Sequence, residues 1–380
     1  MERKLASIRK VLTTKPIEGA DAIELAVVDG WQTVIKKGEF QVGDLCVYFE
    51  IDSFLPIREE FEFLRKSSYK KMGEEEGFRL KTIRLRGELS QGLIVPLKSL
   101  ETFMTHDKWV ELYGDEELEY VVPYEDWLEL KEGDDVTAIM GVQKYEAPIP
   151  TELRGQIRGS FPSYIRKTDE ERIQNLFYKV KDEMVDVEFE VSLKLDGTSC
   201  TFYVVDPTVH NTKLEEPADV YFGHCSRNLD TKDTDNTPWT LAKESGIKDR
   251  MIAFFNRTGR SIAIQGELMG PSIQGNREKF TKPEFFLFNI WDIDQQRYLT
   301  PAERADIVEE LQVKTVPILH TNLKVFEIGN DINDILLFAE GESINNPIRE
   351  GLVFKSNILY KGELFSFKAI SNKFLLKGGE

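Results

Sequence analysis

The stretch VEFEVSLKLDG, residues 187–197, alternates apolar and polar side chains as far as Asp196. This period of two is typical of a β-strand with one apolar and one polar face. Asp196 and Gly197 then predict a tight turn into a second strand, TSCTFYVV. Lys194 therefore lies on the polar face at the end of a strand, with Asp196 on the same side.

This position suits a lysine nucleophile beside a carboxylate that can hold metal-bound water. Attack on phosphorus needs a neutral amine, so the pKa of the lysine must fall through nearby cations, a divalent metal or desolvation. The short motif taken alone favours an exposed strand lysine before an ordinary Asp-Gly turn. The functional interpretation therefore depends on the motifs downstream of Lys194.

Several further motifs come after Lys194 in a fixed order. They are SRN (226–228) with Arg227, IQGELMGPSIQGN (264–276) with Glu267, EFFLFNIWD (284–292) with Phe286 and Phe288, REGLVFK (349–355) with Glu350 and Lys355, and FSFKAISNKFLLK (365–377) with Lys368. Together with KLDG at 194–197, this order resembles the motifs of the covalent nucleotidyltransferase superfamily: ATP-dependent DNA and RNA ligases and mRNA capping enzymes. The resemblance implies that Lys194 becomes covalently joined to a nucleotide.

Each motif also has a physical role in nucleotidyl transfer. Lys355 and Lys368 are candidate cations for the α-phosphate, and Glu267 and Glu350 are candidates to hold Mg²⁺ or a ribose hydroxyl. Phe288 is the candidate aromatic face for the purine, although a phenylalanine on an apolar strand is as often part of the core. The P-loop pattern GxxxxGK[ST] is absent from the sequence, which excludes that mode of ATP binding.

The N-terminal sequence predicts a small β-barrel. Residues 1–55 contain short β-branched or aromatic runs about ten residues apart, separated by Gly-Ala-Asp, Asp-Gly and Lys-Gly turn signals. A further strand is expected over 78–97, where apolar residues alternate with cations and Lys81, Arg84 and Arg86 form an exposed nucleic-acid-binding face. The segment 136–145 is expected to close this domain. A barrel that only packs against the second domain is the alternative.

Two long segments indicate which branch of the superfamily the chain resembles. The N-terminal stretch 4–56 and FPSYIRKTDEERIQN (161–175), with GPSIQGN and FKAISNKFLLK, look like the family-5 RNA ligases of the Deinococcus/Naegleria type. Only twelve residues come after Lys368, so we expect no C-terminal OB domain of the kind that DNA ligases and capping enzymes carry. The resemblance implies an ATP-dependent ligase that seals 3′-OH/5′-phosphate breaks in RNA or in nicked RNA-containing duplexes.

The expected fold class is α+β, in three parts. An OB-like β-barrel domain covers 1–146 and includes an acidic insertion at about 101–135, a Pro-rich linker covers 147–167, and a nucleotidyltransferase domain of antiparallel sheets and helices covers 168–380. Amphipathic periodicity predicts a helix over 168–184 that starts at Thr168 or Asp169. Further helices are expected at 238–256, 300–312 and 331–340.

The resemblance also implies a role for each site residue, with ATP and Mg²⁺ (or Mn²⁺) as cofactors. It implies Lys194 as the AMP-carrying lysine, Arg227 as a ribose or phosphate contact, Glu267 at the ribose, Phe288 stacked on adenine, Lys355 and Lys368 at phosphate, Arg172 at the triphosphate, Leu193 among the cofactor-binding residues, and Asp196, Glu267 and Glu350 at the metal. One position departs from the pattern: the last motif often has a second lysine where this chain has Ile370. Whether Lys373 replaces it stays open.

The formal net charge of −17 argues against a polyanionic partner at first sight. However, residues 101–135 alone hold thirteen Asp and Glu against two Lys, which is typical of a solvated insertion. Cations cluster elsewhere in the chain, so RNA remains an expected partner.

From the remaining features we expect a protein of a reducing cytoplasm that acts as a monomer and does not bind a membrane. The start of the chain has no apolar signal segment, and no run is long enough to span a bilayer. The three cysteines are too few for a disulfide framework. Cys200 with His224 and Cys225 lacks zinc-ligand spacing.

Two alternative functions stay open: an RNA-binding OB protein with a degenerate catalytic core, and an atypical DNA ligase or capping-type nucleotidyltransferase.

Overall fold

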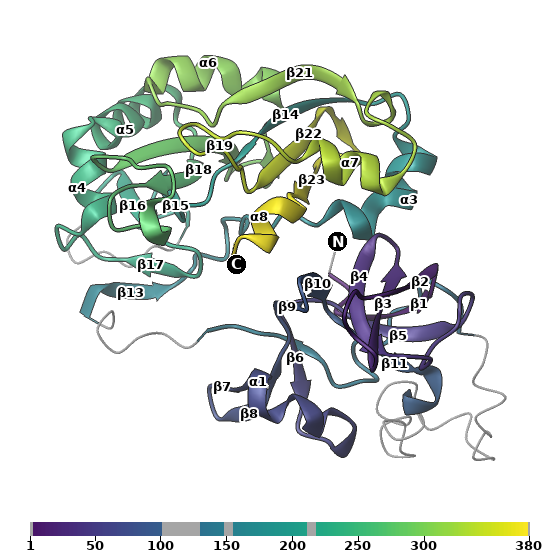
Figure 1. The fold of residues 1–380 in the computed structure, drawn as a ribbon. Helices are drawn as coiled ribbons and strands as arrows, with labels where there is room; N and C mark the ends of the chain where they lie inside the picture. The colour runs from purple at the N-terminus through teal and green to yellow at the C-terminus, as the bar shows by residue number, and fades with distance from the viewer. Residues whose placement is uncertain (1–2, 101–129, 148–154, 211–217, 379–380) are drawn as a thin grey trace, which may run out of the picture. The chain divides into compact units, whose positions relative to one another are not determined.

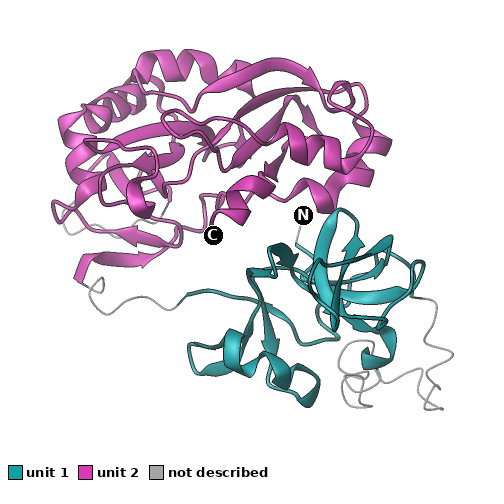
Figure 2. Ribbon diagram, viewed as in Figure 1, with its two compact units in different colours: residues 1–149, 380 teal, residues 150–379 magenta. Residues whose placement is uncertain are grey.

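The computed structural model describes residues 3–100, 130–147, 155–210 and 218–378. The chain forms two compact units, Met1–Ile149 and Pro150–Gly379 (Figure 2). Most of the predicted acidic insertion and part of the predicted linker lie outside the described residues. Within the described ranges, no helix combines the length and the apolar character needed to cross a bilayer.

The regular secondary structure of unit 1 is mainly short strands (Figure 1). They are β1 Ala6–Lys10, β2 Thr13–Pro16, β3 Ile23–Val28, β4 Trp31–Lys36, β5 Leu45–Phe49, β6 Ser53–Pro56, β7 Tyr69–Met72, β8 Glu75–Arg79, β9 Thr82–Leu85, β10 Glu88–Gln91, β11 Leu93–Pro96 and β12 Gln143–Lys144, with the short helix α1 Arg65–Ser68. The ladders give the orders β1-β5-β11, β2-β3-β4, β10-β9 and β12-β6-β8-β7. The predicted strand-rich domain is therefore confirmed.

These ladders do not close into a barrel within the described residues. Between β4 and β10, side chains take the place of the ladder: the Val34 amide donates to Ser90 Oγ (3.0 Å), and Gln32 Nε2 donates to the Leu89 carbonyl (3.2 Å). Strand β5 holds the unit together because both of its faces are buried. Val47 and Phe49 pack into one apolar cluster, and Cys46 and Tyr48 pack into another.

The single strand predicted over 78–97 is wrong. Its residues form the end of β8, the hairpin β9–β10, and β11. The break falls at Arg86 and Gly87, which both have positive φ (53° and 89°) and so form a tight hairpin turn. We call residues 81–91 the cationic hairpin, because Lys81, Arg84 and Arg86 are all exposed on it.

Unit 2 contains two antiparallel sheets and the helices that cover them (Figure 1). The seven-stranded sheet has the order β13 Ile157–Ser160, β17 Leu229–Thr231, β16 Tyr221–Cys225, β15 Thr198–Val205, β18 Ile262–Met269, β19 Glu284–Asp292 and β20 Arg297–Tyr298. The four-stranded sheet has the order β21 Ile318–Lys324, β14 Glu188–Lys194, β22 Gly351–Tyr360 and β23 Glu363–Ile370. We call this second sheet the lysine sheet. Strand β13 lies inside the segment that the sequence predicts as a linker.

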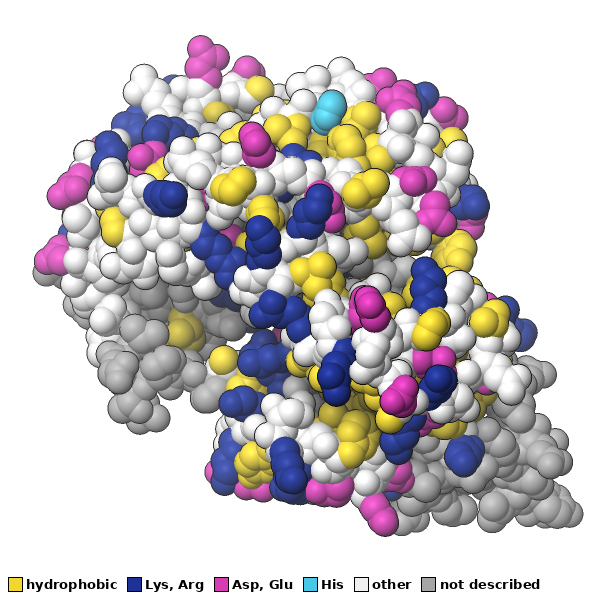
Figure 3. All heavy atoms as spheres, viewed as in Figure 1, with side chains coloured by type: hydrophobic (Ala, Val, Ile, Leu, Met, Phe, Trp, Pro, Cys, Tyr) yellow, Lys and Arg dark blue, Asp and Glu magenta, His cyan; other side chains and the backbone are white. Residues whose placement is uncertain are grey.

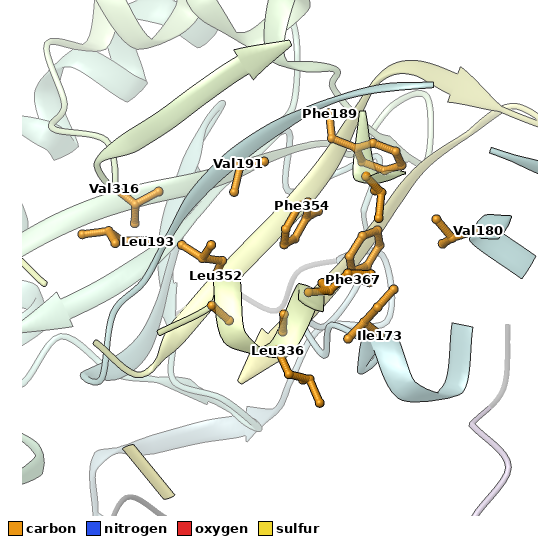
Figure 4. Packing of buried hydrophobic residues seen from close by; sticks show 14 of the residues in the cluster. Ile173, Val180, Phe189, Val191, Leu193, Val316, Leu336, Leu352, Phe354 and Phe367 are labelled. Carbon is orange, nitrogen blue, oxygen red and sulfur yellow. The ribbon is translucent and has the colours of Figure 1, made fainter. Parts of the chain in front are cut away.

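The apolar face of the lysine sheet forms one of the two large apolar clusters of unit 2 (Figure 4). Phe189, Val191 and Leu193 of β14 are buried there, as the alternation predicts. On the neighbouring strands, Phe354 and Phe367 stack with ring centroids 4.7 Å apart. The residues that alternate with these apolar side chains must therefore project from the other face of the sheet.

The helices of unit 2 agree with the predicted ones, with three differences: α8 (Asn372–Leu376) was not predicted, and two predicted helices differ in extent. The others are α3 Ile173–Glu183, α4 Thr237–Glu244, α5 Ile247–Thr258, α6 Pro301–Leu311 and α7 Ile332–Phe338. The helix predicted over 238–256 is two helices, because Gly246 adopts a left-handed conformation (φ 74°) between them. The helix predicted from Thr168 or Asp169 starts only at Ile173, because Glu171 and Arg172 instead pair with the backbone of Lys368 on β23.

Candidate active site

The register of the lysine sheet brings three lysines from distant motifs to one face. Lys194 on β14 pairs with Gly351 on β22, while Val353 of β22 pairs with Lys368 on β23. Because alternate residues share a face, Lys194, Lys355 and Lys368 all project from the side opposite the apolar core. The seven-stranded sheet contributes Glu267 on β18, whose charge interacts with Lys194, and Phe288 on β19, whose carbonyl accepts from Lys355. The candidate site therefore lies between the two sheets of unit 2.

Lys194 is held in place by a carboxylate from the neighbouring strand. Its Nζ donates to Oε1 of Glu350 at 2.6 Å. Glu350 directly precedes β22, so the same register that pairs Lys194 with Gly351 brings the two side chains together. Glu350 is 8% exposed, whereas the Lys194 side chain is 27% exposed. The Lys194 side chain is thus the more accessible of the two.

Glu267 reaches the same corner from the other sheet. Its Oε1 accepts a hydrogen bond from the Gly197 amide at 3.1 Å, directly after the Asp-Gly turn. A Cβ at Gly197 would lie only 2.6 Å from the Leu268 carbonyl oxygen, so this close approach requires glycine. Burial raises the pKa of the Glu267 carboxyl to about 7; Lys194 opposes the shift, and Glu350 and Asp196 add to it.

The donor chemistry of this corner fits a hard divalent cation. Asp196, Glu267 and Glu350 are close enough for their charges to interact, and carboxylate oxygens are the ligands that Mg²⁺ and Mn²⁺ prefer. The described residues contain no group of three or more His, Cys, Asp or Glu arranged as a ligand set. Such a cation would therefore depend on water and substrate phosphate as well as on these carboxylates. In the structure, Oδ2 of Asp196 faces Nη1 of Arg277 at 3.3 Å.

Lys355 lies deeper on the same face and is 1% exposed. Its Nζ donates to the Phe288 carbonyl and lies 5.5 Å from the centre of the Phe288 ring. Burial lowers the pKa of the Lys355 amine to about 7, and repulsion from the Arg304 guanidinium adds to the shift. Arg304 on α6 is itself buried and donates to Oε1 of Glu190 at 2.5 Å. Glu190 pairs with Lys355 in the register of β14 and β22.

Phe288 owes its position to a β-bulge. Gln265 pairs with Asn289 and Gly266 pairs with Leu287, so Phe288 is an extra residue on β19. A bulge of this kind interrupts the regular pairing, while the Phe288 ring packs against the same apolar cluster as Phe286. Phe288 remains partly exposed, whereas Phe286 is buried against Phe280 at 5.6 Å between ring centroids.

At the other end of the site, the Asp169 carboxylate lies near two of the predicted cations, Arg227 and Lys368. Oδ1 of Asp169 lies 4.0 Å from Nη2 of Arg227 and 4.0 Å from Nζ of Lys368. Arg227 is strongly exposed, and Lys368 is partly exposed. Arg172, which is 3% exposed, forms a parallel bridge with Lys368 through the backbone. These three predicted residues therefore lie together.

Some predicted residues lie elsewhere. The Leu193 side chain is buried in the core on the opposite face from Lys194, so only its backbone could contact a cofactor. Ile370 is buried, and the nearby Lys373 is an exposed residue of α8 paired with Glu340 at 2.7 Å. Lys81, Arg84 and Arg86 belong to unit 1.

Sequence reasoning missed four residues that the site uses. Asp169 and Arg277 pair with predicted site residues, and Arg304 and Glu190 form the buried ion pair beside Lys355. The sequence could have indicated Glu190, because strict alternation places it on the polar face of β14. No sequence pattern indicates Arg304, because the residues around it predict only an amphipathic helix.

Comparisons with known proteins agree with these motifs. A sequence-family model described as RNA ligase matches residues 187–370, and one described as an OB-fold domain matches residues 5–97. None of the curated proteins compared with the chain matches it.

Solved structures of Naegleria gruberi RNA ligase resemble the chain along its length. An aspartate-to-alanine variant in the apo form is 40% identical over 99% of this chain and 98% of its own, with a TM-score of 0.74. A lysine-to-alanine variant with ATP and Mn is 40% identical over 98% of this chain and 99% of its own, with a TM-score of 0.74. The ligase with PPi is 41% identical over 99% of each chain, with a TM-score of 0.73. The chain therefore belongs to the RNA ligase family, in the family-5 group of the Naegleria type within the covalent nucleotidyltransferases.

Proposed function

We propose that this protein is an ATP-dependent RNA ligase that seals 3′-OH/5′-phosphate breaks in RNA or RNA-containing duplexes. The observation that carries the proposal is the convergence of Lys194, Glu350 and Glu267 at one corner between the two sheets. Family membership supports the same reaction. The related Naegleria ligase has been solved with ATP and Mn.

In the first step, Lys194 Nζ attacks the α-phosphorus of ATP, pyrophosphate leaves, and a lysyl-AMP bond forms. Lys355, Lys368 and Arg227 would bind the phosphates, where cations offset the negative charge of the transition state. Phe288 would stack on the adenine, since its ring is partly exposed and lies near Lys355. Asp196, Glu267 and Glu350 would hold Mg²⁺ or Mn²⁺, which supplies further charge neutralisation and favours a neutral lysine amine.

In the second step the AMP passes from Lys194 to the 5′-phosphate of the RNA, which frees the lysine. In the third step the 3′-OH attacks that phosphorus, AMP leaves, and a phosphodiester bond closes the break. The exposed Lys81, Arg84 and Arg86 of the cationic hairpin would bind the polynucleotide backbone. RNA or a nicked RNA-containing duplex as partner, action as a monomer, and the domain boundaries 1–146, 147–167 and 168–380 belong to the same proposal.

Covalent labelling tests the proposal directly. The full-length protein is incubated with α-labelled ATP or GTP and Mg²⁺, and the label on the protein is measured. We expect label from ATP, little from GTP, and none in Lys194→Ala. The absence of label from ATP would point to an RNA-binding protein with a degenerate core, and preferential labelling by GTP would point to a capping-type enzyme.

A second assay separates RNA ligases from DNA ligases. Nicked duplexes that differ only in a ribose or deoxyribose 3′-OH strand are sealed in parallel. Faster sealing of the ribose end supports an RNA ligase, and equal or slower sealing contradicts it. A reducing cytoplasm remains the expected location, in agreement with the three cysteines, which are all unpaired and buried.

A further inference from the structure

A basic surface lies directly beside Asp196, on two segments whose motifs have no role in the chemistry above. It consists of Arg277, Lys279 and Lys282 on the loop 270–283, and Lys373 and Lys377 on or just after α8. We call these five residues the basic rim. Figure 3 shows Lys and Arg side chains gathered over the part of unit 2 where Figure 1 draws α8.

Arg277 joins the loop, α8 and the candidate active site. Its Nη1 faces Oδ2 of Asp196 at 3.3 Å, and its Nη2 donates to the Gly378 carbonyl at 2.9 Å. Its guanidinium also lies 4.7 Å from the centre of the Phe374 ring on α8. The basic rim is therefore anchored next to the aspartate of the KLDG motif.

The loop is held in a strained conformation. Gln274, Asn276 and Lys279 all have positive φ (45°, 47° and 55°), which is costly for residues other than glycine. The strain is maintained from inside, because the Asn276 side chain bonds to both the N–H and the carbonyl of Phe280 at 2.8 and 2.9 Å. Glu278 is buried and accepts from the Asn345 amide at 2.7 Å.

This arrangement turns the acidic residue of the loop inward and its lysines outward. Glu278 is 4% exposed, whereas Lys279 and Lys282 are exposed and form no ion pair with the described residues. Lys373 keeps an ion pair with Glu340, but it is still 64% exposed. A set of outward-facing cations beside a phosphate-handling site matches the electrostatic footprint of a polynucleotide backbone.

We propose that the basic rim binds the phosphodiester backbone of the RNA next to the break and so positions the 5′-phosphate at Lys194. This inference rests on the proposed ligase function and adds a second polynucleotide-binding surface, on unit 2. Backbone contacts of this kind fix position without reading sequence. The rim should therefore act on strand joining for any base sequence.

The test compares two charge-matched double variants of the full-length protein. Lys279→Glu/Lys282→Glu reverses two rim lysines. Lys181→Glu/Lys361→Glu reverses two exposed lysines on α3 and on the β22–β23 turn. Two quantities are measured: binding of a nicked RNA duplex as a function of salt, and the rate of sealing divided by the amount of protein labelled from ATP.

For the rim variant we expect binding about tenfold weaker at 50 mM salt, and a slope of log Kobs against log[salt] that is smaller by about 2, because each lost phosphate contact removes about 0.9. The ratio of sealing to labelling should also fall about tenfold. The matched control should keep the wild-type slope and ratio.

An unchanged slope and ratio in the rim variant would overturn the inference, and so would an equal loss in the control. These outcomes differ from a failure of the proposed function, in which the wild-type protein takes no label from ATP. Melting curves of both variants show whether each is folded, and Lys279→Ala/Lys282→Ala, with half the charge change, should lie between wild type and the reversal.

Discussion

The lysine sheet of unit 2 and the cationic hairpin of unit 1 place their cations in opposite surroundings. On the lysine sheet, Lys355 is buried and Lys194 has a carboxylate partner at 2.6 Å, so each charge depends on a particular neighbour. On the hairpin, Lys81, Arg84 and Arg86 are all exposed to solvent. A buried charge becomes unfavourable when a single partner is removed, whereas exposed charges act together and are screened by salt. The two regions should therefore respond to substitution in different ways.

The largest effect is expected at Lys194. Lys194→Ala removes the atom that forms the covalent bond to AMP, so labelling by ATP should fall by at least about 10⁴-fold. Gel-based detection of labelled protein measures this. Lys361→Ala, at an exposed turn, is the control and should label like wild type. Substantial labelling of Lys194→Ala would place the nucleophile elsewhere.

The buried ion pair beside Lys355 should show the next largest effect. Glu190→Ala leaves the Arg304 guanidinium buried without its carboxylate, which should lower the free energy of unfolding by about 3–5 kcal/mol. Urea unfolding measures this. The double variant Glu190→Met/Arg304→Met removes both charges and should recover most of the loss. A cost below about 1 kcal/mol in the single variant would show that the pair is not strongly coupled.

Glu267 should make stability depend on pH. Folding raises the pKa of its carboxyl from 4.5 to about 7, so between these values the folded state keeps a proton that the unfolded state has lost. The stabilising contribution is therefore full below about pH 4.5 and is lost as the pH rises through 7. Relative to wild type, Glu267→Gln should gain roughly 3 kcal/mol between pH 4.5 and pH 8. Urea unfolding at both pH values tests this, and a constant difference would contradict the assignment.

The smallest effect is expected on the cationic hairpin. The triple variant Lys81→Glu/Arg84→Glu/Arg86→Glu should reduce nick sealing about tenfold at 50 mM salt, or ~1.4 kcal/mol, with a different salt dependence from wild type. A triple reversal of Lys15, Lys36 and Lys37, also exposed on unit 1, is the matched control. If the hairpin variant still seals at the wild-type rate at moderate salt, unit 1 does not bind RNA through this surface.

The sequence predicted the site best where its residues keep a strand period. Alternation in β14 placed Lys194 on the polar face, and the order of the motifs identified the family. Alternation could not show that this polar face is covered, because the residues that cover it come from other motifs. Glu190 and Ser192 are both buried, since the seven-stranded sheet and α6 lie over them.

The predictions failed where a local signal competed with a distant partner. The acidic residues before α3 read as a helix start, but Glu171 and Arg172 pair with the backbone of Lys368, almost two hundred residues away in sequence. The run over 78–97 read as one strand, because its alternation continues through the turn at Arg86 and Gly87. Local patterns record propensity, and pairing between distant segments overrides it.

The sequence by itself determined the strand carrying Lys194, the order of the motifs and the family, because these depend on residue types and spacing along one chain. Only the tertiary structure decided which side chains meet. The β-sheet register sets Lys194 against Glu350, the pairing of β18 with β19 is irregular at Phe288, and α6 places Arg304 beside Lys355. These features result from strand pairing and from the packing of a helix on a sheet, so no local pattern in the sequence encodes them.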